Sequence, residues 1–300
     1  MDWLERMNRA LGYVERNLTN EVDMNVVAQM ACCSSYNFQK MFSFITEISL
    51  AEYIRHRRLT LAAFEIQNSN VKIIDVALKY GYESPVSFAR AFQALHGISP
   101  SLAREDGVVL KAYPRMSFQI SIKGESEMEY RIEKKEAFDI FGVETIGSSI
   151  GDESYESPAK LWQESFKNGT YDKLFQDAGD LPTFISQDLC KIHGGINYRK
   201  TEENTFPYML CSFVGNNSKT GGYSIAHIPA QTYAIFPSKR FRWDEDFSTV
   251  LTTLQKRFYS EWLPTSNYEK IDGAEFEIYG GNSEDGYIEL WYPVVKKQND

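Results

Sequence analysis

The first hundred residues contain the same helical pattern twice, and this duplication restricts the possible folds more than any other feature of the chain. Val26–Ala31 and Ile74–Lys79 are both short segments dominated by apolar residues and alanine. Each is followed by a turn and then by a segment that holds two of the phenylalanines Phe38, Phe42, Phe88 and Phe92. A small alanine in the first helix lets the second helix cross it closely, as a helix-turn-helix requires. The pattern therefore predicts two helix-turn-helix motifs about 50 residues apart. We expect Val26, Phe42, Phe88 and Phe92 in their core.

The surrounding residues continue the helical periodicity. Apolar residues recur every three or four positions over Leu4–Leu18, which predicts an N-terminal helix. A helix over Ser49–Gln67 would be about 28 Å long at 1.5 Å per residue. Such a spacer could hold the two second helices about one DNA turn apart, near 34 Å. The pattern ends at Gly97–Pro100, because proline discourages further helix, and we place the end of this domain at residue 107.

The second helix of each motif carries side chains that could read bases. On the first of these helices the expected solvent face is Ser35, Tyr36, Gln39 and Lys40. On the second it is Pro85, Val86, Ser87, Ala89 and Arg90. Glutamine can pair with adenine through two hydrogen bonds, and lysine can reach guanine or phosphate. In the second set only Arg90 is a strong base reader, and an ion-paired arginine is its alternative, as an exposed aromatic is for Tyr36.

Further positive charges lie outside these two helices, at Arg55, Arg57, Arg58 and Arg104. Arg55 and Arg58 are three positions apart on the expected spacer helix. Contacts with DNA phosphates and ion pairs that hold the two motifs together are equally compatible with this spacing.

Several segments resemble the signatures of AraC-type transcription regulators. They are Tyr53–Leu59, Asp75–Ser84 and Phe88–Phe92 followed by Gly97–Pro100. The last signature usually ends in Tyr-Arg, whereas Ala103-Arg104 stands here. The resemblance covers almost all of residues 1–107 and implies an all-α double helix-turn-helix domain that binds double-stranded promoter DNA. Two readers in one chain would let a monomer bind an asymmetric site of about 20 base pairs.

The rest of the chain has a different pattern. Residues 108–126 alternate between apolar and polar types, which predicts a bridging segment of extended chain or an edge strand. Beyond it we expect helices at Pro158–Phe175 and Trp243–Trp262, and strands at Glu129–Lys134, Asp139–Ile146, Lys191–Tyr198, Tyr208–Phe213, Tyr223–Ile228, Thr232–Pro237, Ala274–Tyr279 and Tyr287–Val294. The order strand, strand, helix, strand, strand occurs twice. This predicts an α+β domain with an antiparallel sheet and two pseudo-twofold halves over residues 127–300, with a ligand at their junction.

Residues 127–296 resemble GyrI-like effector-binding domains, through Gly222–Phe236, Glu261–Tyr268, Glu275–Tyr279 and Glu289–Val294. Several regulators join an AraC-type domain to one of this kind. The resemblance implies a multidomain protein whose C-terminal domain binds a small-molecule effector, with a ligand-facing acid on the last strand.

Candidate effector contacts lie on that strand. By strict alternation Tyr287, Glu289 and Trp291 share one face. A carboxylate between aromatic rings suits a cation, because it offers an opposite charge and π faces. Aromatic side chains on the two expected helices could complete the aromatic walls, with the core as their alternative place: Trp162, Phe166 and Tyr171 on the first helix and Trp243 on the second. A glutamate in water is the alternative for Glu289, and for the second candidate, Glu277, we expect exposure to solvent.

Net charge and composition limit the ligands and partners that the two parts of the chain can bind. The net charge is −9, of which residues 1–107 carry −1 (11 Lys+Arg against 12 Asp+Glu) and residues 108–300 carry −8 (21 against 29). An acidic C-terminal part suits cationic or neutral ligands, while DNA contacts in the N-terminal part must come from local patches. No apolar run is long enough to span a membrane, and no secretory signal is visible.

Other residue patterns speak against metal and catalytic sites. The four cysteines form no C-x-x-C motif, which favours a reducing cytoplasm. The histidines lack zinc-binding spacing, and no nucleophile elbow or phosphate loop occurs. We therefore expect no cofactor, no metal and no enzymatic activity.

The sequence thus predicts a cytoplasmic bacterial transcription regulator that binds promoter DNA and a small, cationic or amphipathic effector. The effector would bias promoter binding or contact with RNA polymerase. Two alternatives remain open for the C-terminal domain, a protein-binding module and a small-molecule hydrolase using Glu289 and a tyrosine. The sequence leaves the operator, the effector, the sense of regulation and the oligomeric state undetermined.

Overall fold

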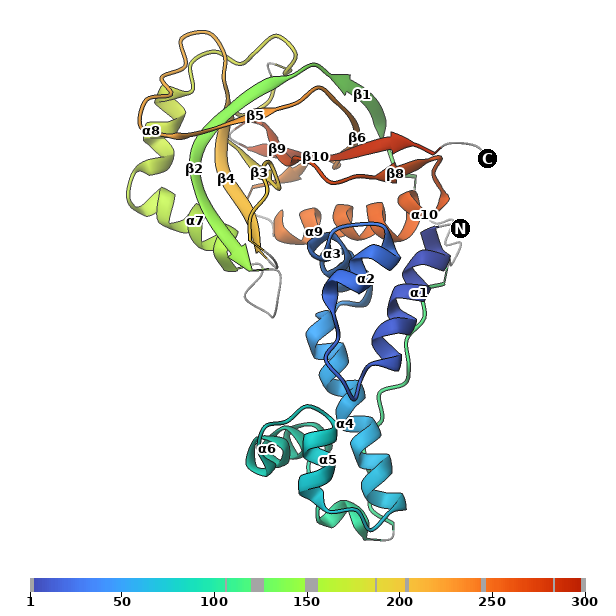
Figure 1. Ribbon diagram of the computed structural model, residues 1–300. Coiled ribbons are helices and arrows are strands. Elements are labelled where there is room, and N and C mark those ends of the chain that lie inside the picture. The colour runs from blue at the N-terminus through green and yellow to red at the C-terminus, as the bar shows by residue number, and fades with distance from the viewer. Residues whose placement is uncertain are drawn as a thin grey trace. The chain divides into compact units, whose positions relative to one another are not determined.

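The structure is a computed structural model that describes residues 3–105, 107–119, 127–148, 156–186, 188–202, 205–243, 247–282 and 284–297 (Figure 1). Contacts divide the chain into two compact units. The N-terminal unit contains residues 1–38 and 46–119, and the C-terminal unit contains residues 39–45 and 120–300. No helix among the described residues is both long and apolar enough to cross a bilayer.

The N-terminal unit is helical, as its periodicity predicts. Its helices are α1 (Trp3–Arg16), α2 (Met24–Ala31), the first turn of α3 (Ser35–Thr46), α4 (Leu50–Asn68), α5 (Ile73–Lys79), α6 (Pro85–His96) and a 3₁₀ turn at Leu102–Arg104. Helix starts follow local chemistry. The Asp23 carboxylate accepts hydrogen bonds from the first N–H groups of α2, and the Ser49 and Ser84 hydroxyls do so for α4 and α6.

Each helix pair is joined by a turn with one residue in the left-handed region. In the first pair this residue is Cys32 (φ 54°), and in the second it is Gly81 (φ 82°). Gly81 also lies close to the Arg58 guanidinium, because a Cβ atom at position 81 would stand 2.9 Å from Arg58 Nη1. Only glycine meets both conditions without strain.

The second helix pair has its own core. Phe88 and Phe92 of α6 are fully buried against Val76 and Ala77 of α5 and the apolar face of α4. Ala77 is itself buried in this core, and its role in a close helix crossing stays a prediction. In the first pair Val27, and not its neighbour Val26, takes the fully buried position.

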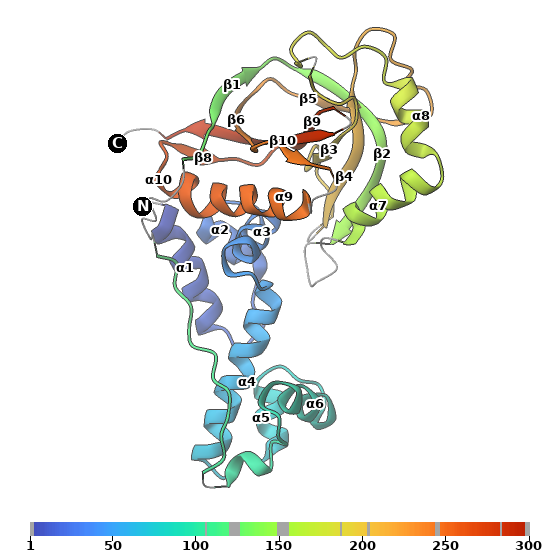
Figure 2. The ribbon, with the colours of Figure 1, turned by 180° about the vertical axis from the view of Figure 1, so that it is seen from behind.

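After the 3₁₀ turn, residues 107–119 run as extended chain beside α4 towards α1 (Figure 2, the green segment). In the described part this segment pairs with no strand, so it takes the extended form and not the edge strand of the two expected forms. The rest of the expected bridge, residues 120–126, lies outside the described residues.

The C-terminal unit is built on one antiparallel sheet. Its strands are β1 (Arg131–Lys135), β2 (Phe138–Ser148), β3 (His193–Ile196), β4 (Thr205–Phe213), β5 (Ser224–Ile228), β6 (Gln231–Pro237), β7 (Phe241–Arg242), β8 (Tyr268–Lys270), β9 (Glu275–Gly281) and β10 (Asp285–Lys296). The order is β1-β6-β10-β9-β3-β4-β2-β5, with β7 and β8 paired to β10. The duplication is visible here, because β6-β10-β9 mirrors β2-β4-β3 about the central β9–β3 pair.

One helical segment stands in the middle of each half, after β2 in the first half and after β6 and β7 in the second. In the first half α7 (Glu156–Lys167) and α8 (Thr170–Asp177) pack on β2 and β4. The single helix expected over 158–175 is broken because Gly169 adopts a φ of 77°. In the second half α9 (Phe247–Arg257) continues into a π-helical turn, Phe258–Trp262, and α10 (Leu263–Thr265).

Both faces of the sheet are covered. Glu277 lies opposite Leu290, and Ile278 lies opposite Glu289, so Glu277 and Glu289 point to opposite faces. Helical segments cover the face of Glu277, where the Phe258 ring stacks on Tyr292 at 3.7 Å. The other face holds an aromatic core that includes Trp291, capped by residues of the segment 181–189.

Candidate DNA interface and effector site

The α6 helix presents its expected reading face. Pro85, Val86, Ser87 and Arg90 are exposed, and 60% of the Val86 surface is open to solvent. Ala89 is half-buried. The Ser87 hydroxyl donates to the Ser84 carbonyl oxygen, so it also serves the start of the helix. This places the predicted DNA contacts of the second motif together on one surface, and their binding to DNA stays a prediction.

On α3 the four residues of the expected DNA-reading face differ in their surroundings. Ser35, Tyr36 and Gln39 are half-buried and stay predicted DNA contacts. The Lys40 ammonium, however, lies 3.0 Å from Glu275 Oε2, and both residues belong to the C-terminal unit. The prediction for Lys40 is therefore wrong in this structure, because a carboxylate already neutralises its charge.

The arginines on α4 differ in their surroundings. Arg55 is exposed and lies 3.8 Å from Glu52. Arg58 donates to the carbonyl oxygens of Leu18 and Asn20, both at 2.8 Å, just beyond α1. Of the two roles left open for Arg58, the structure therefore supports the structural one, in which it joins the end of α1 to the turn of the second motif.

Arg104 also has a contact within the N-terminal unit. Its guanidinium donates to the Val71 carbonyl oxygen, which precedes α5. Arg104 remains exposed, so a further contact with DNA is still a prediction.

The predicted effector residues Tyr287, Glu289 and Trp291 do share one face of β10, as alternation requires. Glu289 is buried, with 7% of its surface exposed, which excludes the alternative of a glutamate in water. Its Oε2 accepts hydrogen bonds from Arg131 Nη2 at 2.8 Å and from Trp291 Nε1 at 3.0 Å. Tyr287 is half-buried beside Arg240, whose guanidinium lies 5.5 Å from the ring centre.

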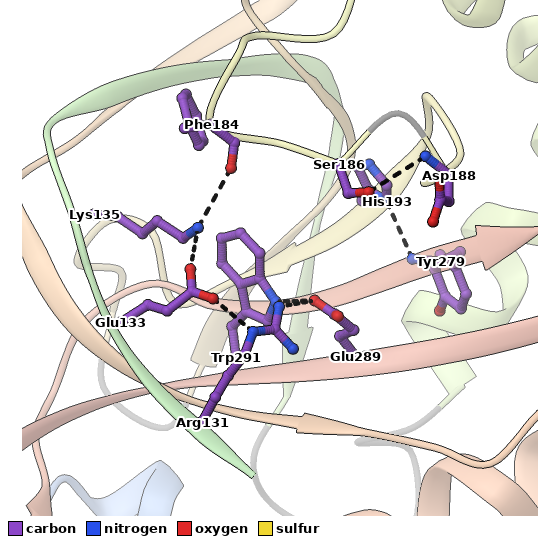
Figure 3. Close-up of polar contacts among 10 residues, drawn as sticks. All are labelled: Arg131, Glu133, Lys135, Phe184, Ser186, Asp188, His193, Tyr279, Glu289 and Trp291. Carbon is purple, nitrogen blue, oxygen red and sulfur yellow. Dashed lines mark hydrogen bonds and ion pairs between the residues drawn. The ribbon is translucent and has the colours of Figure 1, made fainter. Parts of the chain in front are cut away.

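Glu289 and its aromatic neighbour Trp291 already have positively charged partners on β1 (Figure 3). Lys135 Nζ lies 4.9 Å from the centre of the Trp291 ring. Glu133 pairs with Lys135 at 2.5 Å and with Arg131 at 2.6 Å. Two carboxylates and two cations thus balance one another, and the chain itself supplies the positive charge that Glu289 was expected to attract from a ligand.

Trp162, Phe166 and Tyr171 lie elsewhere, on the opposite face of the sheet. Trp162 Nε1 donates to the Tyr208 hydroxyl at 2.7 Å, and its ring packs edge-on against Tyr279 at 5.4 Å. Tyr279 shares the face of Glu277 and not that of Glu289, since alternate residues of β9 point the same way. The single site predicted from all six aromatic and acidic residues is therefore wrong, because the sheet separates them.

The acid beside these aromatics is Glu277. Its Oε2 accepts hydrogen bonds from the Tyr208 hydroxyl at 3.2 Å and from the Tyr279 hydroxyl at 3.1 Å. We call Glu277, Tyr208, Tyr279 and Trp162 the acid–tyrosine site. Among the described residues no lysine or arginine forms an ion pair with Glu277. Gly194 lies directly opposite Glu277 on β3, and its missing side chain provides the space in which the Tyr208 hydroxyl and the Glu277 carboxylate meet. A Cβ atom there would stand 2.5 Å from the Tyr208 hydroxyl and 3.0 Å from Glu277 Oε2.

Burial controls the electrostatics of this site. It raises the pKa of Glu277, although Lys40 and the two tyrosine hydroxyls act in the opposite direction. It also raises the pKa of Tyr208 and of Tyr279 well above the usual value, and the nearby Glu277 charge adds to both effects. The tyrosines therefore stay protonated and donate to the acid, and a bound cation would stabilise the ionised carboxylate.

Further aromatic rings extend the site towards solvent. Phe166 packs on Tyr171 with ring centres 4.6 Å apart, and both lie within 6.2 Å of Trp162. Phe166 is 58% exposed, so the core alternative does not apply to it, while Trp162 and Tyr171 are half-buried.

The prediction that Glu277 faces solvent is wrong, because helices cover the face on which it lies. Alternation assigns Glu277 to a face but does not reveal that both faces are covered. The sequence did contain a signal for the burial of Glu277. Its neighbours on β9 are apolar, and the strand Tyr208–Phe213 offers a tyrosine as the hydrogen-bond donor that a buried acid needs.

The two helix-turn-helix motifs and the duplicated sheet with its buried acid define an AraC-type transcription regulator with an effector-binding domain. Residues 131–294 match the model of the integron-associated effector binding protein family, to which the chain belongs. Residues 27–106 match a helix-turn-helix domain model.

Two curated relatives match the N-terminal part. The transcriptional activator AarP of Providencia stuartii is 43% identical over 98 residues, which is 33% of this chain and 73% of the relative. The regulatory protein SoxS of Escherichia coli K12 is 33% identical over 91 residues, which is 30% of this chain and 85% of the relative. One relative is named a transcriptional activator and the other a regulatory protein, which supports the prediction of a non-enzymatic regulator.

Solved structures resemble the C-terminal part. One is SAV2435 bound to tetraphenylphosphonium, with a TM-score of 0.43 and 18% identity, covering 56% of this chain and 94% of that one. Another is an integron cassette protein of Vibrio cholerae, with a TM-score of 0.36 and 14% identity, covering 55% and 95%.

Proposed function

We propose that this regulator binds promoter DNA through α3 and α6 and binds a small aromatic or amphipathic cation at the acid–tyrosine site. Occupation of that site would change promoter affinity or contact with RNA polymerase, in the cytoplasm where the promoter lies. The observation that carries the effector half of the proposal is Glu277, a buried carboxylate that lies among aromatic rings.

Charge and burial support Glu277 over Glu289. A buried carboxylate is costly unless a positive charge or several hydrogen-bond donors compensate it. Glu289 has Arg131, whereas Glu277 has only neutral hydroxyl donors within hydrogen-bond distance. A cation placed near Glu277 would gain an ion pair in a medium of low dielectric constant and the π faces of Trp162 and Tyr279.

Access to the acid requires movement of the residues above it. Only 8% of the Glu277 surface is exposed, and Trp162 of α7 lies over Tyr208 and Tyr279. The exposed Phe166 and Phe175 indicate that α7 and α8 bury only part of their apolar surface. This partial burial supports an entry route in which the ligand displaces α7 and replaces its contacts.

Calorimetric titration of the full chain with tetraphenylphosphonium tests this assignment. We expect binding to the wild type, and about a tenfold or larger loss of affinity in Glu277→Gln, because the ion pair is removed while the shape is kept. Glu289→Gln is the matched comparison on the other face and is expected to keep the wild-type affinity. Neutral triphenylphosphine oxide should bind wild type and Glu277→Gln alike.

Two results would contradict the assignment. One is equal affinity of the cation for wild type and Glu277→Gln, and the other is a loss confined to Glu289→Gln. Circular dichroism of each variant establishes that its fold is intact before its affinity is interpreted.

A further inference from the structure

The extended segment of residues 108–118, which we call the strap, contacts both ends of the N-terminal unit. Leu110 and Tyr113 pack against the core of the second helix-turn-helix motif. At the other end the Phe118 ring lies 6.4 Å from Trp3 of α1. The strap therefore runs beside α4 from the second motif back to the first helix (Figure 2).

Side chains of α1 and α4 bind the strap backbone at intervals. The Tyr113 N–H donates to Thr60 Oγ1 at 3.1 Å. Near the far end Asn8 pairs with both backbone groups of Phe118, accepting from its N–H at 2.8 Å and donating to its carbonyl at 2.9 Å. An asparagine used in this way imitates one rung of a β-ladder and fixes the position of the strap along α1.

Between these points the strap is held by a tyrosine of α4. The Met116 N–H donates to the Tyr53 hydroxyl at 3.1 Å, and the same hydroxyl donates to Glu15 Oε1 of α1 at 2.6 Å. One phenol group thus joins all three segments.

Arg57 joins the same three segments through one guanidinium. Its Nε and Nη2 each lie 2.9 Å from an oxygen of the Glu15 carboxylate, and its Nη1 donates to the Tyr113 carbonyl at 2.6 Å. The side chains of Arg57 and Glu15 are 10% and 8% exposed. A buried, bidentate pair of this kind fixes both distance and direction, which a lysine at the same position would not do.

We propose that Arg57 is a positioning residue of the DNA reader, which fixes the angle between the two helix-turn-helix motifs through Glu15 and the strap and so sets one allowed spacing of DNA half-sites. This proposal rests on the proposed binding of DNA. A single helix such as α4 bends gently under load. A second chain segment tied to it at several points resists bending and twisting, so the two motifs move as one body.

The expected consequence concerns spacing. One base pair inserted between two half-sites rotates one of them by about 35° and shifts it by about 3.4 Å. A rigid reader loses contacts at one half-site after this change, whereas a reader with a loose joint follows the rotation.

The first experiment measures DNA affinity by fluorescence anisotropy. The full-length protein selects its duplex from a random-sequence pool, and base pairs are then inserted or removed between the half-sites. We expect the wild type to lose about tenfold in affinity for one inserted base pair, and Arg57→Lys and Thr60→Val to lose about threefold or less. Arg16→Lys, the same substitution at an exposed position of α1, is the matched control and should behave like wild type.

The second experiment needs no DNA. Spin labels at Gln29 of α2 and Gln93 of α6, in a variant without other reactive cysteines, report the distance between the motifs. We expect a narrow distance distribution in the background protein and a broader one after Arg57→Lys. This readout separates the two proposals, because it remains valid if the protein proves not to bind DNA.

The positioning role is overturned if folded Arg57→Lys keeps both the wild-type spacing preference and the narrow distribution. It is also overturned if Arg57→Lys weakens binding by the same factor at every spacing, since this would indicate a direct contact or a loss of fold. Thermal melts of all variants distinguish those last two causes.

Discussion

At the scale of single residues, exposure and charge on α6 favour Arg90 as the base reader of the second motif. Its neighbours Val86 and Ala89 can offer only apolar contact, whereas a guanidinium can bind guanine through two hydrogen bonds. We expect Arg90→Ala to cost about 1–3 kcal/mol of binding free energy and to relax the preference at one base position. Competition with duplexes substituted at each position measures this change. Equal weakening on every duplex would instead assign Arg90 to a phosphate.

A second prediction concerns pH and His193, which burial keeps neutral. Burial lowers the pKa of His193 to about 3, and Nδ1 accepts a hydrogen bond from the Tyr279 N–H at 3.2 Å (Figure 3). In the unfolded chain the pKa returns to about 6.5, so below that pH the unfolded state binds one more proton. The stability contribution is complete above pH 6.5 and falls by about 1.4 kcal/mol per pH unit down to pH 3.

Urea unfolding of the full chain between pH 7 and pH 4, followed by tryptophan fluorescence, measures this slope. His193→Asn is the informative comparison, because its Oδ1 can accept the Tyr279 N–H without titrating. We expect a shallower pH dependence in that variant. An identical slope in both proteins would show that His193 does not contribute to the acid sensitivity.

The burial of a residue was predictable where a local sequence pattern alone determines it. The buried phenylalanines of α6 follow from periodicity alone. For Glu277 the sequence offered tyrosine donors in Tyr208–Phe213, but it did not show that they meet this acid, because the burial of Glu277 depends on α7 and on Tyr208, about 70 residues away in the sequence. Glu289 was correctly predicted to lie among aromatics, yet its partner Arg131 comes from a distant strand.

At the scale of elements, the turn of the second motif depends on Gly81. Alanine there would meet the backbone strain of a φ of 82° and a contact of 2.9 Å with Arg58 Nη1. Arg58 cannot move away without losing its bonds to Leu18 and Asn20. We expect Gly81→Ala to destabilise the fold by about 2 kcal/mol.

Gly97 provides the control for this prediction, since it has the same φ of 82° but a Cβ atom added to it would have no neighbour within 4 Å. Gly97→Ala should therefore show the backbone cost alone, about 1 kcal/mol. Thermal unfolding of both variants measures the difference. If the two variants melt together, the contact with Arg58 contributes nothing.

Elements were more predictable than their ends. Each of the eight expected strands has a counterpart in the sheet, because alternation and β-branched residues mark strands locally. The break at Gly169 had a local signal in the preceding Asn168, but an apolar stripe continued on both sides of it. The short strands β7 and β8 are defined by pairing with β10 and carry no pattern of their own.

At the scale of the whole molecule, effector and promoter affinity should be coupled reciprocally. If tetraphenylphosphonium changes DNA affinity by some factor, DNA must change the affinity for the cation by the same factor. A factor of about 5–150 is typical of such coupling. Anisotropy with and without saturating cation, and calorimetry with and without duplex, measure the two factors. Glu277→Gln should abolish both, and an undiminished effect in that variant would place the effector elsewhere.

The organisation into a DNA reader and a duplicated sheet domain was predictable, because both patterns repeat within the sequence. The strap was not. Its hydrogen bonds join positions 53 to 110 residues apart, and its partners Asn8, Tyr53 and Thr60 are ordinary helix residues in any local pattern.

The bare backbone of β3 opposite Glu277 has a consequence for how such a regulator could be silenced. Gly194 has no positive φ, so its backbone would accept alanine, and the one added methyl group would stand where the tyrosine hydroxyl and the carboxylate now meet. That methyl group would act as a permanent, uncharged occupant. We expect a Gly194→Ala chain to keep its sheet and its reading helices and to lose the proposed response to an effector.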